Sequence, residues 1–121
     1  AVAMALPGAT IDQIHDHCVR RLTEGLVELK LLEGPAEARI ADQGYKKFFM
    51  HGTSHWLGLD VHEEPYLVKG NKTLIQPGMT FSDEPGIYIR GEFGVRHEDD
   101  MYITENGAEL FTPQPTSIET I

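Results

Sequence analysis

Two hydrophobic periodicities divide the sequence, and their order restricts the fold more than any other feature. In residues 10–33 apolar side chains recur at steps of three and four, the spacing of one face of an α-helix. Thr10 can cap this helix with Gln13 as its capping-box partner, and Gly34-Pro35 is expected to end it. The apolar stripe consists of Ile11, Ile14, Cys18, Leu22, Leu26 and Leu29.

A second, shorter helix is expected within residues 35–43, closed by Gly44, so that the helices cover about residues 10–43. From residue 46 onward aromatic and branched residues alternate with glycine and proline turns, which predicts a sheet over about residues 46–112. It includes a strand over 79–89 and a tight hairpin at Asn106-Gly107. Helices followed by antiparallel strands predict an α+β fold.

Composition excludes several classes of partner. The chain has 121 residues and a net charge of −9, which argues against nucleic acid, because phosphate binding needs a basic surface. No apolar run approaches the about 20 residues of a membrane span. Cys18 is the one cysteine, so no internal disulfide can form, and we expect a reducing, cytoplasmic setting.

Three of the six histidines, His51, His55 and His62, fall in one short segment rich in glycine and apolar residues. Among the acidic residues of the strand region, Glu84 lies just before Pro85-Gly86, and Glu98 lies in the next expected strand. Residues two apart share a face of a strand, and a bend is expected after Glu84. We therefore expect one imidazole and two carboxylates from different strands to converge.

Such a cluster is suited to a divalent cation. Two carboxylates close together in a core repel each other and lose hydration, and a cation removes both penalties. Histidine with carboxylates fits manganese, cobalt or zinc, and hydrolysis is the natural reaction class. Spacing alone leaves other interpretations open: hydrogen-bonded core histidines, a turn glutamate at position 84, and a solvated strand end at residues 98–100.

Three segments together resemble the C-terminal half of the catalytic domain of aminopeptidase P and prolidase: FFMHGTSHWLGLDVHEEP, LIQPGMTFSDEPGIYI and GVRHEDDMYITENGAELFT. These families are the Xaa-Pro-cleaving members of the pita-bread metallopeptidases, which also include methionine aminopeptidase and creatinase. The resemblance covers essentially the whole chain. It implies half of a pita-bread fold, with one long and one short helix packed on a curved antiparallel sheet.

The resemblance also implies a metal centre. His55 corresponds to the histidine ligand, Glu84 to a carboxylate ligand that is also the general base, and Glu98 to the carboxylate that bridges two metals. The intact enzyme is expected to hold two divalent ions, manganese first and cobalt or zinc as alternatives.

The resemblance further implies a substrate site. His51 and His62 correspond to the two histidines that bind the substrate and the developing oxyanion. Arg96 corresponds to an arginine that supports the metal carboxylates. The implied partner is a proline-containing peptide.

Two features depart from the family pattern. The first is that Asp83 and His97 stand where the family has apolar residues, and alternation directs both away from the site face.

The second feature concerns the metal ligands. The family's first two metal ligands, both aspartates, precede the helix with which this chain starts. We therefore expect residues 1–121 to be a partial catalytic domain, without the N-terminal domain and first half. Such a chain is expected to bind metal weakly or not at all, to be inactive alone, and to form a homo-oligomer.

The expected function of the intact protein is metal-dependent hydrolysis of the Xaa-Pro bond at the N-terminus of peptides, as an aminopeptidase or a dipeptidase. Two alternatives stay open. One is another hydrolase of the same fold, of the creatinase or methionine aminopeptidase type. The other is a non-catalytic pita-bread module that binds proteins.

Overall fold

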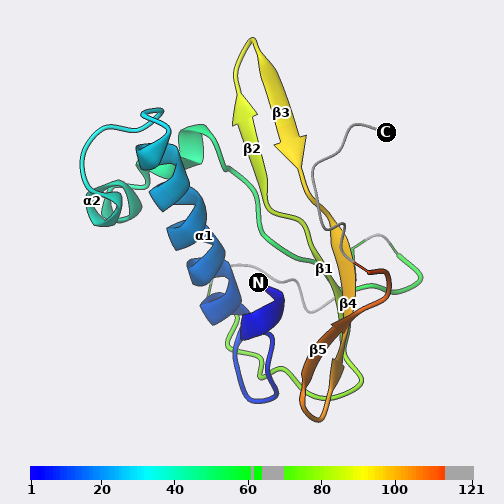
Figure 1. Ribbon diagram of the computed structural model, residues 1–121. Helices are drawn as coiled ribbons and strands as arrows, with labels where there is room; N and C mark the ends of the chain where they lie inside the picture. Colours follow the sequence, from blue (N-terminus) through cyan, green and yellow to red (C-terminus); the bar gives the residue numbers. More distant parts are fainter. Residues whose placement is uncertain (61, 64–69, 114–121) are drawn as a thin grey trace.

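The long helix α1 runs from Ile11 to Glu28 in a computed structural model that describes residues 1–60, 62–63 and 70–113 (Figure 1). Its predicted capping box is confirmed: the Thr10 side chain accepts from the Gln13 backbone N–H, and the Gln13 side chain accepts from the Thr10 N–H. This reciprocal pair satisfies two of the backbone donors that a helix leaves free at its start.

The predicted end of α1 at Gly34 is wrong, because the helix stops six residues earlier. Lys30 takes a left-handed backbone conformation (φ 59°). Its N–H then bonds the carbonyl of Val27, and the N–H of Leu31 bonds that of Leu26. This is the Schellman arrangement, in which glycine is the usual left-handed residue. Leu29 therefore leaves the apolar stripe and is 71% exposed.

Two short helical segments follow, of which the sequence predicts only the first. Helix α2 spans Ala36–Ala41, and the 3₁₀ helix η2 spans Gly44–Lys47. Gln43, with φ 59°, takes the left-handed position that was expected of Gly44. Another 3₁₀ turn, η1, spans Val2–Met4.

The strands of the described residues form two antiparallel sheets, which confirms the α+β fold. One has the order β1-β4-β5 and the other pairs β2 with β3. The predicted tight hairpin joins β4 and β5; its turn residues are Glu105 and Asn106, and Gly107 is the first residue of β5. The bounds are Thr80–Asp83 for β1, Gly86–Ile89 for β2, Phe93–Arg96 for β3, Asp99–Thr104 for β4 and Gly107–Leu110 for β5.

The sheet begins later than predicted. Residues 48–60 are irregular apart from an isolated bridge between Trp56 and Phe81, and residues 61 and 64–69 lie outside the described part. The strand expected over 79–89 is divided by Glu84-Pro85, and a second interruption falls at residues 97–98. Proline has no N–H to donate to a ladder, which explains the first interruption.

The two interruptions lie opposite each other. β1 pairs with β4 up to Asp83 and Asp99, and β2 pairs with β3 from Gly86 and Arg96 onward. Between them the His97 N–H donates to the Pro85 carbonyl at 3.2 Å. The strands thus form one bent ladder, and Figure 1 shows β2 and β3 projecting beyond the helices as a ribbon.

The core lies between α1 and the strands. Its larger cluster joins the first turns of α1 to β1 and β4, and a smaller one joins the middle of α1 to η2. Its most deeply buried large residues include Ile14, Leu26, Phe49, Ile75, Phe81 and Met101. No helix in the described part of the chain has the length and apolar character needed to cross a membrane.

Candidate metal centre and substrate pocket

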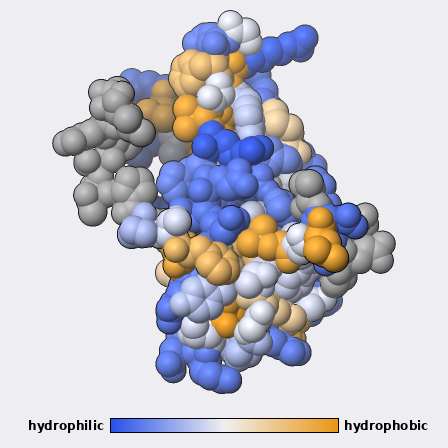
Figure 2. All heavy atoms as spheres, turned by 90° about the vertical axis from the view of Figure 1, so that its right-hand side faces the viewer, coloured by the Kyte–Doolittle hydropathy of each residue, from blue (hydrophilic) through white to orange (hydrophobic). Residues whose placement is uncertain are grey.

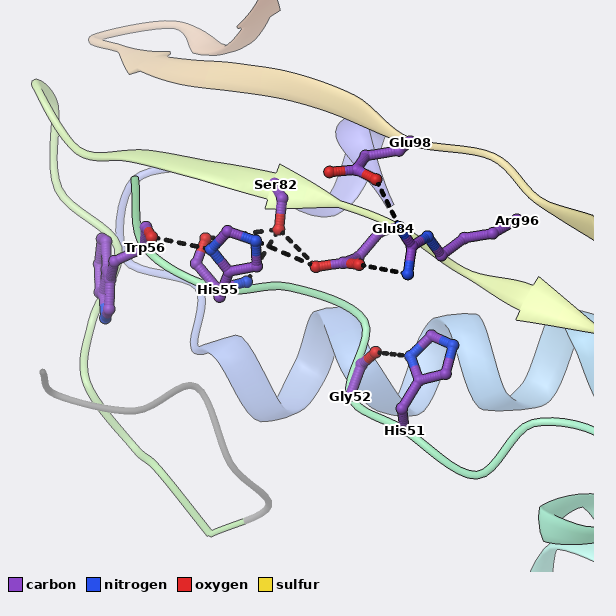
Figure 3. A network of polar contacts seen from close by, with 8 residues as sticks. All are labelled: His51, Gly52, His55, Trp56, Ser82, Glu84, Arg96 and Glu98. Atoms are coloured by element: carbon purple, nitrogen blue, oxygen red, sulfur yellow. Dashed lines mark hydrogen bonds and ion pairs between the residues drawn. The ribbon is translucent and has the colours of Figure 1, made fainter. Parts of the chain in front are cut away.

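His55, Glu84 and Glu98 lie together at the junction of the two sheets (Figure 3). Each offers one ligand atom, and these atoms all lie within 4.8 Å of one another. His55 comes from the irregular segment before the strands, whereas Glu84 and Glu98 come from the two interruptions of the ladder. Their separation in sequence is thus bridged by the pairing of β1 with β4 and of β2 with β3.

The backbone of His55 is held by β1. Its N–H donates to the Ser82 hydroxyl at 2.9 Å, and its carbonyl accepts from the Ser82 N–H at 2.9 Å. The Ser82 hydroxyl is also 3.1 Å from Glu84 Oε1, to which it can donate. One buried serine therefore positions both the imidazole and a carboxylate.

The imidazole of His55 faces a carboxylate in a way that suits a cation. Its Nδ1 lies 2.9 Å from the Trp56 carbonyl, which can only accept, so Nδ1 carries the proton. In the neutral ring Nε2 then presents a lone pair, and it points at Glu84 Oε1 from 3.3 Å. Two acceptors at this distance require a proton or a cation between them.

Arg96 lies between the two carboxylates. Its Nη2 is 3.1 Å from Glu98 Oε2, and its Nη1 is 3.6 Å from Glu84 Oε2. Glu98 first and Glu84 second raise the pKa of Arg96 above its ordinary value, so the guanidinium stays charged. The arginine reduces the repulsion between the acids and holds them at one point.

The donor set fits a divalent metal. One imidazole nitrogen and two carboxylates are ligands that manganese, cobalt and zinc accept, and the histidine donates its other N–H to a carbonyl, as ligating histidines usually do. Glu84 and His55 are largely buried, and Glu98 is the exposed member. The arrangement can hold a cation on one wall of an open site.

The predicted substrate residues lie beside this cluster. A pocket of about 350 Å³ is lined by His51, Gly52, Ser54, His55, His62, Glu84 and Arg96. His62 is exposed, and its ring centroid lies 5.0 Å from that of His55. A larger hollow of about 630 Å³ lies between η1, α1 and α2 and contains none of the predicted site residues.

His51 is oriented by a residue that the sequence analysis did not single out. Its Nδ1 lies 2.6 Å from the Gly52 carbonyl, and its Nε2 lies 2.9 Å from the Tyr88 hydroxyl. Because Nδ1 must donate, the Tyr88 hydroxyl donates to Nε2. Alternation places Tyr88 on the same face as Glu84, but its reach to His51 depends on how the ribbon folds against residues 48–52.

The two departures from the family pattern lie in different surroundings. Asp83 is buried opposite Asp99 in the β1–β4 pair, and its Oδ1 has no hydrogen-bond partner among the described residues. Burial raises the pKa of Asp83, and Asp99 adds to the rise. His97 Nδ1 lies 3.4 Å from Asp99 Oδ2. Neither departing residue belongs to the three-residue cation cluster.

An imidazole with two carboxylates on an α+β scaffold defines a candidate metallohydrolase centre, and the comparisons agree with this class. Residues 1–105 match metallopeptidase family M24. The Xaa-Pro aminopeptidase of Haemophilus influenzae is 38% identical over 93% of this chain, and that of Escherichia coli is 38% identical over 95%. A Lactobacillus delbrueckii Xaa-Pro dipeptidase is 46% identical over 67% of the chain.

A solved structure shows the same fold. That of Pseudomonas aeruginosa aminopeptidase PepP has a TM-score of 0.83 and 42% identity, and the match covers 90% of this chain. The chain belongs to metallopeptidase family M24, and its fold is part of the pita-bread fold. It spans only 28% and 29% of the length of the two aminopeptidase relatives, and 27% of the solved chain.

Proposed function

We propose that these residues are the C-terminal part of a metal-dependent peptidase that hydrolyses the Xaa-Pro bond at the N-terminus of peptides. The supporting observation is the cluster of His55, Glu84 and Glu98, with ligand atoms within 4.8 Å, beside a pocket that contains His51 and His62. The relatives named as Xaa-Pro aminopeptidases and as an Xaa-Pro dipeptidase supply the substrate class.

In this proposal the three clustered residues hold divalent ions, manganese first, together with further ligands from outside the chain. A bound divalent ion lowers the pKa of water and polarises a carbonyl, which is the chemistry that peptide hydrolysis requires. Glu84 also accepts the proton that is released during attack on the Xaa-Pro carbonyl, and later delivers it to the proline nitrogen. Arg96 keeps both carboxylates in place throughout.

The pocket histidines bind the substrate. His62 is the more exposed of the two and can donate to the oxyanion that develops on the scissile carbonyl. Both ring nitrogens of His51 are engaged, by Gly52 and by Tyr88, so its ring lines the pocket in one fixed orientation. Proline in the second position suits such a site because its imide nitrogen has no hydrogen to offer to a general protease.

Metal binding by the 121-residue chain tests the first half of this proposal without depending on activity. Calorimetry with Mn²⁺ should show weak binding that Glu84→Gln and Glu98→Gln abolish. Glu105→Gln, which changes an exposed glutamate in the β4–β5 turn, is the matched control and should bind as the parent chain does. Equal binding by all four proteins would contradict the proposed ligands.

Peptide cleavage tests the second half. A longer polypeptide that contains these residues should, with Mn²⁺, cleave peptides with proline in the second position and leave matched peptides with alanine there intact. The 121-residue chain alone should give no comparable turnover. Preferential release of N-terminal methionine or hydrolysis of creatine would favour the other hydrolases of the fold, and no turnover by the longer protein would favour a binding module.

A further inference from the structure

The loop of residues 51–55 carries two candidate site residues but belongs to no strand. One side of this loop is attached to the sheet by backbone hydrogen bonds. The His55 carbonyl accepts from the Ser82 N–H at 2.9 Å. The Thr53 carbonyl accepts from the Glu84 N–H at 2.7 Å, so this second bond joins the loop directly to a candidate metal ligand.

The other side of the loop contacts α1 through the side chain of Thr53. Thr53 is 2% exposed, and its hydroxyl oxygen lies 3.0 Å from Nδ1 of His15 on α1. Either group can donate in this hydrogen bond, because a hydroxyl both donates and accepts. Thr53 therefore joins a helix side chain, through its hydroxyl, to the backbone of Glu84, through its carbonyl.

A second route runs from His15 to the substrate pocket. The ring of Phe49, which is 1% exposed, contacts two imidazoles. Its centroid is 6.1 Å from that of His15 and 5.0 Å from that of His51, and the His51 ring is edge-on at 79°. His15 thus reaches His51 through Phe49 and Glu84 through Thr53, with one residue between them in each case.

Histidine at position 15 combines two properties that these contacts need. Its ring packs on Phe49, and its Nδ1 bonds the Thr53 hydroxyl. An aliphatic side chain can pack against Phe49 but cannot bond a hydroxyl, and a buried hydroxyl that loses a partner costs free energy. His17, two residues further along α1, is exposed and lines the separate hollow between η1, α1 and α2.

Helix α1 supports the site from behind. Figure 3 shows α1 running behind the loop that carries His51 and His55. Figure 2 shows the side of the molecule that is turned away from α1, where hydrophilic residues gather at mid-height with hydrophobic residues above and below them. His15 is not among the residues that line the pocket beside the metal cluster, so it acts on the site through other residues.

We propose that His15 is a positioning residue of the candidate site, which holds the Glu84 backbone through Thr53 and the His51 ring through Phe49. The positioning does not depend on any reaction, whereas its effect on metal and substrate binding rests on the proposed function. The first contact needs a hydrogen-bonding atom in the place of Nδ1, and the second needs a ring. Two substitutions of His15 can therefore remove the contacts one at a time.

Amide hydrogen exchange in the metal-free 121-residue chain tests the link to Glu84. The reference is the amide of Ile103, which bonds the Met79 carbonyl in the core and reports a general loss of stability. His15→Phe keeps a ring but lacks Nδ1, and should raise the exchange rate of Glu84 relative to Ile103 by about threefold to tenfold. His15→Asn, whose side-chain amide takes the place of Nδ1, should restore the parent ratio.

The NMR signals of the His51 ring test the link through Phe49. They should shift in His15→Asn, which has no ring to pack on Phe49, and should stay near their parent positions in His15→Phe. His17→Ala is the control and should change neither the exchange ratio nor the ring signals.

Two results would overturn the proposal. The first is a ratio of Glu84 to Ile103 exchange that is unchanged in both His15 variants or rises equally in both, because a merely structural role makes no distinction between phenylalanine and asparagine. The second, which would remove the route through Phe49, is a set of His51 ring signals that His15→Asn leaves in place.

Thr53 allows the same test from the other end of the hydrogen bond, and it also decides the matter if a His15 variant fails to fold. Thr53→Val has nearly the same shape but no hydroxyl, and should raise the exchange ratio as His15→Phe does. Thr53→Ser keeps the hydroxyl and should leave the ratio at the parent value. Equal ratios in the valine and serine variants would contradict the link.

Calorimetry with Mn²⁺ distinguishes this inference from the proposed function. The affinity should fall about threefold to tenfold in His15→Phe and stay at the parent level in His15→Asn and His17→Ala. Parent-level binding in His15→Phe, with binding abolished in Glu84→Gln, would overturn the role of His15 and leave the metal centre intact. A parent chain that binds no Mn²⁺ would contradict the proposed metal centre, and the exchange ratio would still decide the role of His15.

Discussion

The sheet β1-β4-β5 and the ribbon β2–β3 are continuations of the same two chain segments, yet they differ in what supports them. The sheet contributes Phe81, Met101 and Ile103 to the core, and none of these is more than 2% exposed. In the ribbon every residue of β3 is exposed. A two-stranded ribbon is marginally stable in water unless something packs on it. The candidate metal centre lies where the two regions meet.

Because of this difference, the buried sheet and the exposed ribbon position different residues of the site. The buried sheet places His55 and Glu84, through Ser82 and the bridge between Trp56 and Phe81. The exposed ribbon supplies Arg96 and, through Tyr88, orients His51. We therefore expect changes in the sheet to alter stability and metal binding together, and changes in the ribbon to act mainly on the pocket.

The largest difference in the free energy of unfolding is expected between alanine substitutions of two phenylalanines, one in the sheet and one in the ribbon. Phe81→Ala removes a fully buried ring that packs edge-on against Trp56, and should lower the free energy of unfolding by about 3–5 kcal/mol. Phe93→Ala, in the exposed ribbon, should change it by less than about 0.5 kcal/mol. Urea denaturation of the 121-residue chain measures both. Similar losses would show that the ribbon is packed as firmly as the sheet.

Ser82→Ala should affect both stability and metal binding. The change leaves the His55 N–H without its partner, at a cost of about 1–3 kcal/mol, and releases Glu84 from one hydrogen bond. Removal of such supporting contacts commonly lowers metal affinity about 10–100-fold. Calorimetry with Mn²⁺ measures the affinity. Ser54→Ala, in the same pocket, is the control, and an affinity that falls equally in both variants would contradict the role of Ser82.

Asp83→Val should stabilise the chain at neutral pH by about 1 kcal/mol, because it removes a buried carboxylate whose Oδ1 has no described partner. Since folding raises the pKa of Asp83 above 3.8, the folded chain binds more protons than the unfolded chain in the interval above that value. Stability therefore falls as pH rises through the interval, and the gain from valine should shrink toward pH 3.5.

Denaturation midpoints at pH 7 and pH 3.5 measure this effect. Asp100→Val, on an exposed position of β4, should show a difference of less than about 0.5 kcal/mol at either pH. A gain for Asp83→Val that is larger at the lower pH would contradict the direction of the pKa shift.

The smallest effect is expected for Tyr88→Phe in the ribbon. Loss of one hydroxyl contact to His51 should lower kcat of the longer peptidase by about threefold to tenfold, as expected for one neutral hydrogen bond, and leave Mn²⁺ affinity unchanged. Tyr102→Phe removes a hydroxyl bonded to Glu109 and should leave kcat as it was.

Some of the structure could be predicted because it depends on neighbours in the sequence. The α1 capping box and the Asn106-Gly107 hairpin follow from residues at most four positions apart. Alternation likewise placed Ser82 and Glu84 on one face, and Pro85 predicted the bend after them. The end of α1 was predicted wrongly because Lys30 took a left-handed conformation that local rules assign to glycine.

The sequence by itself determined the fold class, the family resemblance and the identity of the candidate ligands, since each follows from residue types in a fixed local order. Only the tertiary structure decided that His55, Glu84 and Glu98 lie within 4.8 Å and that Ser82 and Tyr88 orient the site. These facts depend on contacts between segments far apart in the sequence, such as His51 with Tyr88 and His55 with Ser82. Their geometry is set by strand pairing and core packing, which no local pattern specifies.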